Sequence, residues 1–145
     1  MTRSKHRRGA NALEFALIFP IFWLLLGGAA DLGWLFYHQS ILDAATVVGC
    51  RAGAIVDPGW NETDMANVEQ AANDAMIHVL DAYPGTYCDP HHDDCYLSVT
   101  PTGTAPGRSL ICRVERDFTP IIGVAARPVR LHSAIAVRME WQRWP

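Results

Sequence analysis

One uninterrupted apolar run dominates the N-terminal third of the chain. No charged residue occurs from Phe15 to Ala30, and the run reaches 21 residues if it begins at Ala10. About 20 predominantly apolar residues span the hydrocarbon core of a bilayer as an α-helix. The pattern therefore predicts a membrane-spanning helix over residues 10–30. Pro20 removes one backbone hydrogen bond inside this helix and predicts a local kink.

Beyond the apolar run, apolar positions continue at helical spacing, but polar residues now lie between them. Apolar side chains recur about three, four or seven positions apart as far as Val56, which is the period of an amphipathic helix. The sequence thus predicts one continuous helix over residues 10–56. Its first half is apolar all round, and its second half, residues 31–56, is amphipathic.

Small residues recur every four positions in this second half, at Ala45, Gly49 and Gly53. A stripe of small residues lets another backbone approach the helix closely. The stripe fits packing against a neighbouring subunit and packing inside the chain's own domain equally well. Both are compatible if they occur at different heights along the helix.

Residues 57–145 predict a small domain of a second helix followed by strands. Turn residues around Pro58 precede a helix that runs from Asn61 to about Ala82 and ends at Pro84-Gly85. Alternating, β-rich segments then predict three strands, over Tyr96–Thr100, Ser109–Glu115 and Ser133–Trp141. A long helix packed against a second helix and a small antiparallel sheet makes an α+β fold.

Charge is distributed unevenly along the 145 residues. The net charge is −3, but four of the twelve Lys and Arg residues lie in the first eight positions, which leaves −7 for the rest. Basic residues accumulate on the cytoplasmic side of membrane helices, so residues 1–9 predict a cytoplasmic leader and an exported C-terminal domain. Because the exported part lacks a basic face, nucleic acid is not an expected partner.

A secretory signal peptide is the alternative interpretation of the apolar run, with Gly28-Ala29-Ala30 as a small-residue cleavage site. The run is at the long limit for such a peptide, and Glu14 would intrude on it. The helical pattern also continues past Ala30. A membrane helix is therefore the preferred interpretation.

Glu14 is the one charged residue within the predicted span. A carboxylate costs roughly 2.5–3.5 kcal/mol near the bilayer centre and less toward the interface, so its presence predicts a function. If a peptidase cut after Gly9, Ala10 would carry a free α-amino group with a pKa near ~8, one helical turn from Glu14.

The junction of leader and apolar run resembles a known family. Residues 7–20, Arg-Arg-Gly-Ala-Asn-Ala-Leu-Glu-Phe-Ala-Leu-Ile-Phe-Pro, resemble the N-terminal signature of TadE-like pseudopilins, minor pilin-like proteins of tight-adherence (Tad/Flp) pilus systems. Asp31-Leu32-Gly33 and residues 44–53 extend the resemblance, and residues 133–140 add a looser match. The resemblance implies cleavage between Gly9 and Ala10, with Glu14 and its aromatic neighbour Phe15 acting in maturation and assembly.

The function that the resemblance implies is structural and not enzymatic: a minor pseudopilin that takes part in assembling a Tad/Flp type IV pilus for adhesion or secretion. Its partners would be a prepilin peptidase, other pilins, Tad assembly platform proteins and the inner membrane. The N-terminus would be cytoplasmic and the C-terminal domain periplasmic, or incorporated in an extracellular pilus. The alternative is a single-pass membrane-anchored periplasmic protein with an unprocessed anchor and a metal-binding loop.

Four cysteines in a small exported domain predict disulfides. Of the three possible connectivities we favour Cys88 with Cys95 and Cys50 with Cys112, which ties the long helix to the sheet. The segment between Cys88 and Cys95 also holds His and Asp donors, but their spacing fits no familiar zinc pattern and a disulfide would use both sulfurs. No metal or cofactor is expected.

No arrangement of a nucleophile with a base stands out in the sequence. His132 and Ser133 are adjacent in a predicted strand, where neighbouring side chains point to opposite faces. The isolated His38, His78 and His132 are expected to be structural. Gly27-Gly28 is not followed by the Lys of a phosphate-binding loop.

Overall fold

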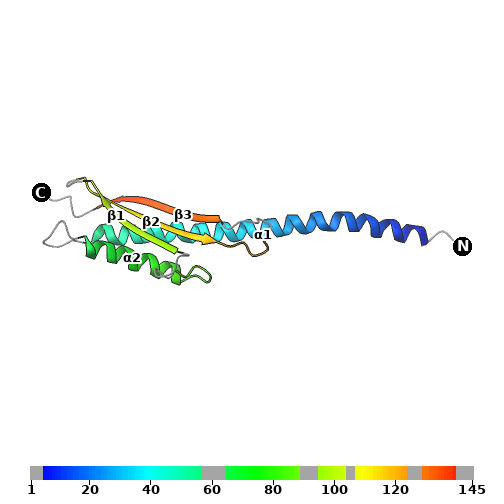
Figure 1. Ribbon diagram of the computed structural model, residues 1–145, viewed down its shortest axis with the longest axis horizontal. Helices are drawn as coiled ribbons and strands as arrows, with labels where there is room; N and C mark the ends of the chain where they lie inside the picture. Colours follow the sequence, from blue (N-terminus) through cyan, green and yellow to red (C-terminus); the bar gives the residue numbers. More distant parts are fainter. Residues whose placement is uncertain (1–4, 57–64, 89–94, 104–106, 124–128, 140–145) are drawn as a thin grey trace. The chain divides into compact units, whose positions relative to one another are not determined.

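The computed structural model describes residues 5–56, 65–88, 95–103, 107–123 and 129–139, with only the backbone described for residues 5–11. Within these ranges two helices are followed by three strands: α1 (Lys5–Ile55), α2 (Ala66–Asp81), β1 (Cys95–Thr102), β2 (Ser109–Phe118) and β3 (Val129–Arg138), as labelled in Figure 1. The predicted α+β class, with a long apolar N-terminal helix, a second helix and a small antiparallel sheet, is confirmed.

Helix α1 is continuous from Lys5 to Ile55 and passes through Pro20 without interruption. It begins five residues before the predicted start at Ala10 and ends one residue before the predicted end at Val56. The helix contributes to two compact units. The first contains α1 up to Leu35 together with the segment that begins at Thr119, and the second contains the rest of α1, α2 and the sheet.

The sheet is antiparallel with strand order β1-β2-β3, so β2 is the central strand. Cys112 of β2 is opposite Val99 of β1 and Ile135 of β3. Along β2, Leu110, Cys112 and Val114 are buried, whereas the residues between them face outward. This period of two is what a sheet with one covered face requires.

The third strand differs from its prediction, because it begins at Val129 and not at Ser133 and ends at Arg138. Residues 129–132 therefore extend the strand at its N-terminal end. Leu131 is buried, and Arg130 pairs across the strands with Asp117 through an Nε–Oδ1 hydrogen bond of 2.9 Å. That hydrogen bond lowers the pKa of the Asp117 carboxyl. Residues 140 and 141 of the predicted strand lie outside the described residues.

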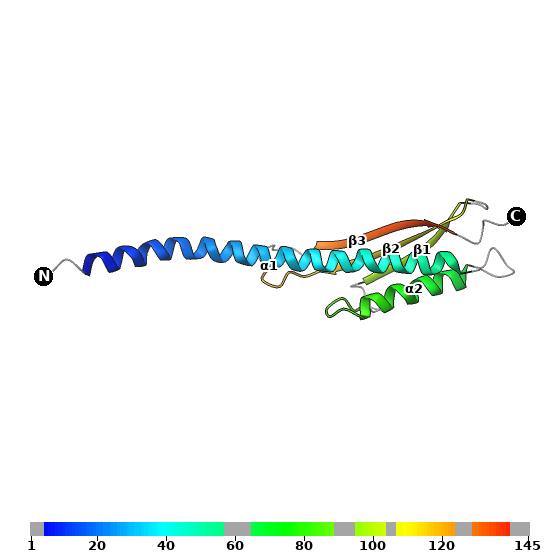
Figure 2. The same ribbon diagram turned by 180° about the vertical axis from the view of Figure 1, so that it is seen from behind.

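Helix α2 lies against the C-terminal half of α1, and Figure 2 shows the pair from the opposite side. One residue per turn is fully buried along α2: Val68, Ala72, Met76 and Leu80. These residues form the packed face of α2. The predicted stop at Pro84-Gly85 also agrees, since the hydroxyl of Thr86 donates to the carbonyl of Leu80 at 2.7 Å and satisfies a free helix end. The predicted start at Asn61 lies outside the described residues.

Candidate functional site

The predicted cleavage junction lies in the first turns of α1. Gly9 and Ala10 are both helical in the described backbone. A glycine inside a helix is about 1 kcal/mol less favourable than an alanine, so Gly9 lowers the stability of this helical turn. A helix that opens there would release the junction without disturbing the apolar run that follows.

Glu14 stands at the start of an exposed apolar surface. Its side chain is exposed, as are those of its neighbours Leu13 and Phe15. Among the described residues, neither a hydrogen bond nor an ion pair reaches the Glu14 carboxylate. The carboxylate at the start of the apolar surface therefore has no hydrogen-bond or ion-pair partner within the described portion of its own chain.

Every residue from Ala12 to Leu26 is exposed in the isolated chain. The large apolar members of this surface are Leu13, Phe15, Leu17, Ile18, Phe19, Ile21, Phe22, Trp23, Leu24, Leu25 and Leu26. A helix that is apolar all round requires apolar surroundings, which are lipid or other helices. Within the described residues, this is the one helix long and apolar enough to cross a membrane, and it is compatible with a single-pass anchor.

Three aromatic rings follow one face of this surface at a spacing of four residues. The ring centroids of Phe15 and Phe19 are 5.4 Å apart, and those of Phe19 and Trp23 are 6.3 Å apart. Rings at i and i+4 meet because they lie on successive turns of one helix face. Phe15 is thus part of a ladder of aromatic side chains that runs away from Glu14.

Asp31 is a site residue whose structural role the sequence did not reveal. Its side chain is only 6% exposed, and its Oδ1 accepts a hydrogen bond from the backbone N–H of Ile122 at 2.9 Å. The two residues are 91 positions apart and belong to the same compact unit. The signal in the sequence was an acidic residue directly after an uncharged run, but its partner could not be deduced from spacing.

The small-residue stripe is used inside the chain. Ala45, Gly49 and Gly53 are all buried. A Cβ placed on Gly53 would lie 2.8 Å from Leu110 Cδ2, 2.9 Å from Ala72 Cβ and 3.0 Å from the carbonyl oxygen of Val68. These neighbours belong to α2 and β2, so the structure favours the intramolecular interpretation over a contact with another subunit.

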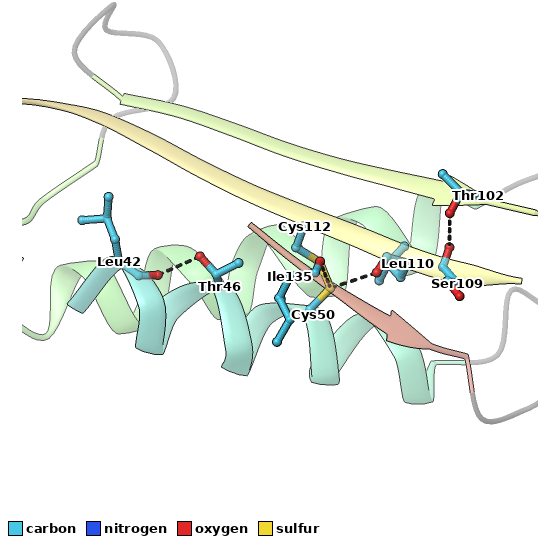
Figure 3. The surroundings of a disulfide bond; sticks show 8 residues. All are labelled: Leu42, Thr46, Cys50, Thr102, Ser109, Leu110, Cys112 and Ile135. Atoms are coloured by element: carbon cyan, nitrogen blue, oxygen red, sulfur yellow. Dashed lines mark hydrogen bonds between the residues drawn. A yellow bond between two sulfur atoms is a disulfide. The ribbon is translucent and has the colours of Figure 1, made fainter. Parts of the chain in front are cut away.

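Two disulfides join the four cysteines in the pairing that the sequence favoured. Cys50 is joined to Cys112 and Cys88 to Cys95, with Cα–Cα distances of 5.5 and 5.6 Å. Figure 3 shows the first disulfide between α1 and the sheet, with Cys50 Sγ 3.3 Å from the carbonyl oxygen of Leu110. Because a disulfide sulfur carries no hydrogen, this approach is a close contact and not a donated hydrogen bond.

Of the three isolated histidines singled out in the sequence, His38 is buried, whereas His78 and His132 are exposed. His38 is buried against the edge of Phe118, with ring centroids 5.6 Å apart. Burial, assisted by the positive charge of Arg116, lowers the pKa of His38. His132 is exposed on β3, while its neighbour Ser133 is half-buried and points to the other face, so the two do not form a nucleophile and base.

The described residues contain no group of three or more His, Cys, Asp or Glu side chains that would hold a metal ion. The donors between Cys88 and Cys95 lie outside the described residues. Both of those cysteines are joined in a disulfide, so neither offers a thiolate to a metal.

Comparison with known protein families addresses the N-terminal region directly. The family model described as TadE-like protein matches residues 9–51. The N-terminal region is TadE-like. The TadE-like region begins at Gly9, contains the exposed apolar surface and Asp31, and ends beside Cys50. It associates the chain with Tad pilus systems and with pilus partners in general, and this pilus-related family is not an enzyme family. No curated protein and no solved structure gives a match.

Proposed function

We propose that the chain is a minor pseudopilin, matured by a prepilin peptidase and taking part in the assembly of a Tad/Flp pilus. The cut falls between Gly9 and Ala10, and the apolar part of α1 first spans the inner membrane with the C-terminal domain in the periplasm. The observation that carries the proposal is the exposed apolar surface of residues 12–26, which has Glu14 near its start and lies within the TadE-like region.

The chemistry of the junction supports this assignment. Gly9 has no side chain to obstruct a protease, and the basic residues before it hold the junction at the cytoplasmic face. Cleavage creates an α-amino group on Ala10 that is cationic at neutral pH. A neighbouring subunit's Glu14 is then a suitable partner for that amine, because a buried polar pair fixes the register between packed helices.

Substitution at Gly9 tests the maturation step. Gly9→Arg places a long charged side chain beside the scissile bond, so we expect an uncleaved chain and loss of piliation when the variant replaces the native protein. Gly9→Ala is the matched control, since it adds one methyl group, and we expect at least partial cleavage. Electrophoretic mobility of the chain with and without co-expressed prepilin peptidase reports cleavage. Normal processing of Gly9→Arg would contradict the proposed cut site.

A further inference from the structure

The segment from Thr119 to Gly123 forms one compact unit with the N-terminal part of α1. The backbone N–H of Ile122 donates to Oδ1 of Asp31 at 2.9 Å, and the carboxylate is largely shielded from solvent. The segment is therefore held at the height of Asp31 along the helix axis.

Asp31 immediately follows the proposed membrane span of residues 10–30. Carboxylates are costly within the hydrocarbon region, so Asp31 marks the outer limit of the span. Trp34 lies one turn further along the helix and is half-buried, and tryptophan is enriched where a membrane meets water. A segment fixed to Asp31 thus lies at the depth of the lipid head groups.

This segment presents two large apolar side chains to its surroundings. Ile121 is 65% exposed and Ile122 is 50% exposed. Pro120 precedes them, and Gly123 follows with a φ of +74°, a conformation that glycine adopts readily. The turn therefore exposes two adjacent isoleucines in the same unit as the exposed apolar surface of α1.

We propose that Ile121 and Ile122 insert into the periplasmic leaflet of the inner membrane, and that Asp31 is the positioning residue that sets their depth. The inference rests on the proposed function, because it requires α1 to span the bilayer with its C-terminal side in the periplasm. Lipid is the proposed occupant because both side chains belong to the same compact unit as the exposed apolar part of α1 and are held beside Asp31, where the uncharged run ends. Burying these side chains among acyl chains removes apolar surface from water.

Site-specific photocrosslinking of the full chain tests this contact. A benzophenone-bearing phenylalanine replaces one residue at a time in protein reconstituted into vesicles of phosphatidylethanolamine and phosphatidylglycerol, and mass spectrometry detects covalent lipid adducts. Position 121 is the test position. Leu25, 69% exposed in the apolar part of α1, is the positive control, and Tyr96, 60% exposed on β1, is the negative control.

The expected result is lipid adducts at positions 25 and 121 and none at 96. Adducts at 25 without adducts at 121 would overturn the loop inference while leaving the membrane span intact. Loss of adducts at both positions would contradict the membrane span and thus the proposed function. Crosslinking of position 121 to a second copy of the chain would also overturn the inference, by assigning the surface to a subunit contact.

Substitution of Asp31 tests its positioning role separately. Asp31→Leu removes the acceptor for the Ile122 N–H, and we expect loss of lipid adducts at 121 with adducts at 25 unchanged. Asp31→Asn keeps an acceptor oxygen and should retain the adducts at 121. Formation of the Cys50–Cys112 disulfide on a non-reducing gel verifies that each variant folds. Undiminished adducts at 121 in folded Asp31→Leu would overturn the role of Asp31.

Discussion

Gly49 of α1 and Met76 of α2 approach so closely that a Cβ on Gly49 would collide with the Met76 side chain. The same Cβ would lie 2.8 Å from the backbone carbonyl oxygen of Ala72. Met76 is flexible and has room to adapt by rotation, but the carbonyl belongs to the α2 backbone and moves only with the helix. The two helices are thus packed through a position that only glycine fills.

Gly49→Ala is therefore expected to destabilise the unit that contains α2 and the sheet by about 1–3 kcal/mol, as overpacking of a core does. The intrinsic gain in helix propensity, about 1 kcal/mol, offsets part of this cost. Thermal unfolding of the full chain in detergent micelles, followed by circular dichroism, measures the change. Gly33→Ala is the matched control, because nothing lies within 4 Å of its added Cβ, and it should not lower the melting temperature. An unchanged melting temperature for Gly49→Ala would contradict the proposed packing.

The two disulfides are expected to contribute unequally to stability. Cys50 and Cys112 are 62 residues apart, whereas Cys88 and Cys95 are 7 apart. In the chain-entropy description, closing the longer loop stabilises by about 4 kcal/mol and the shorter one by about 2 kcal/mol.

Denaturant unfolding of the two double alanine variants measures this difference. Cys50→Ala with Cys112→Ala should lose more stability than Cys88→Ala with Cys95→Ala, because all four cysteines are buried and the loop lengths differ. A greater loss in the second variant would contradict the ranking. Titration of the denatured, unreduced native chain should find no free thiol, and four free thiols would contradict both pairings.

Acidification is expected to weaken the domain through His38, which lies beyond the proposed membrane span. Its pKa is lowered in the folded state by burial and by Arg116, so the unfolded chain binds a proton more readily than the folded chain. The stabilising contribution is complete above the ordinary histidine pKa of about 6.5 and is lost as the pH falls through the folded-state pKa. The free energy of unfolding is measured at a series of pH values below about 6.5. As the pH is lowered, it should decrease less steeply in His38→Gln than in the native chain. Equal slopes would exclude His38 as the cause.

Glu14→Ala is expected to impair assembly more than processing. The substitution removes the carboxylate proposed to pair with the Ala10 amine of a neighbouring subunit, while the exposed apolar surface remains. The measurement is the amount of the chain in sheared pilus fractions relative to the membrane fraction. Leu13→Ala is a suitable control, because it changes an adjacent exposed residue without altering charge. Native levels of Glu14→Ala in pili would show that the pairing does not operate.

The long helix was predictable because its pattern is unambiguous. An uncharged run followed by apolar positions at helical spacing leaves little choice, and α1 covers the predicted helix of residues 10–56 except for its last residue. The buried face of α2 was predictable for the same reason, since Val68, Ala72 and Met76 repeat every turn. Local periodicity decides both cases without knowledge of the partner that each face meets.

Other features depend on partners that are distant in sequence. The start of β3 was missed because Val129 and Arg130 are in a strand only through their register with Phe118 and Asp117. Similarly, the small-residue stripe was ambiguous until α2 was seen to cover it. The contact of Asp31 with Ile122 could not be predicted, because it joins an acidic side chain to a backbone N–H that carries no sequence signature.

The mature N-terminus of the native chain tests the central claim most directly. Mass spectrometry of the protein extracted from its own cell envelope, in cells that contain the prepilin peptidase, determines the first residue. The account predicts a chain that begins at Ala10 and lacks the nine residues before it. A chain that still begins at Met1 or Thr2 would contradict maturation and indicate an unprocessed anchor, and one that begins at Asp31 would indicate a cleaved signal peptide.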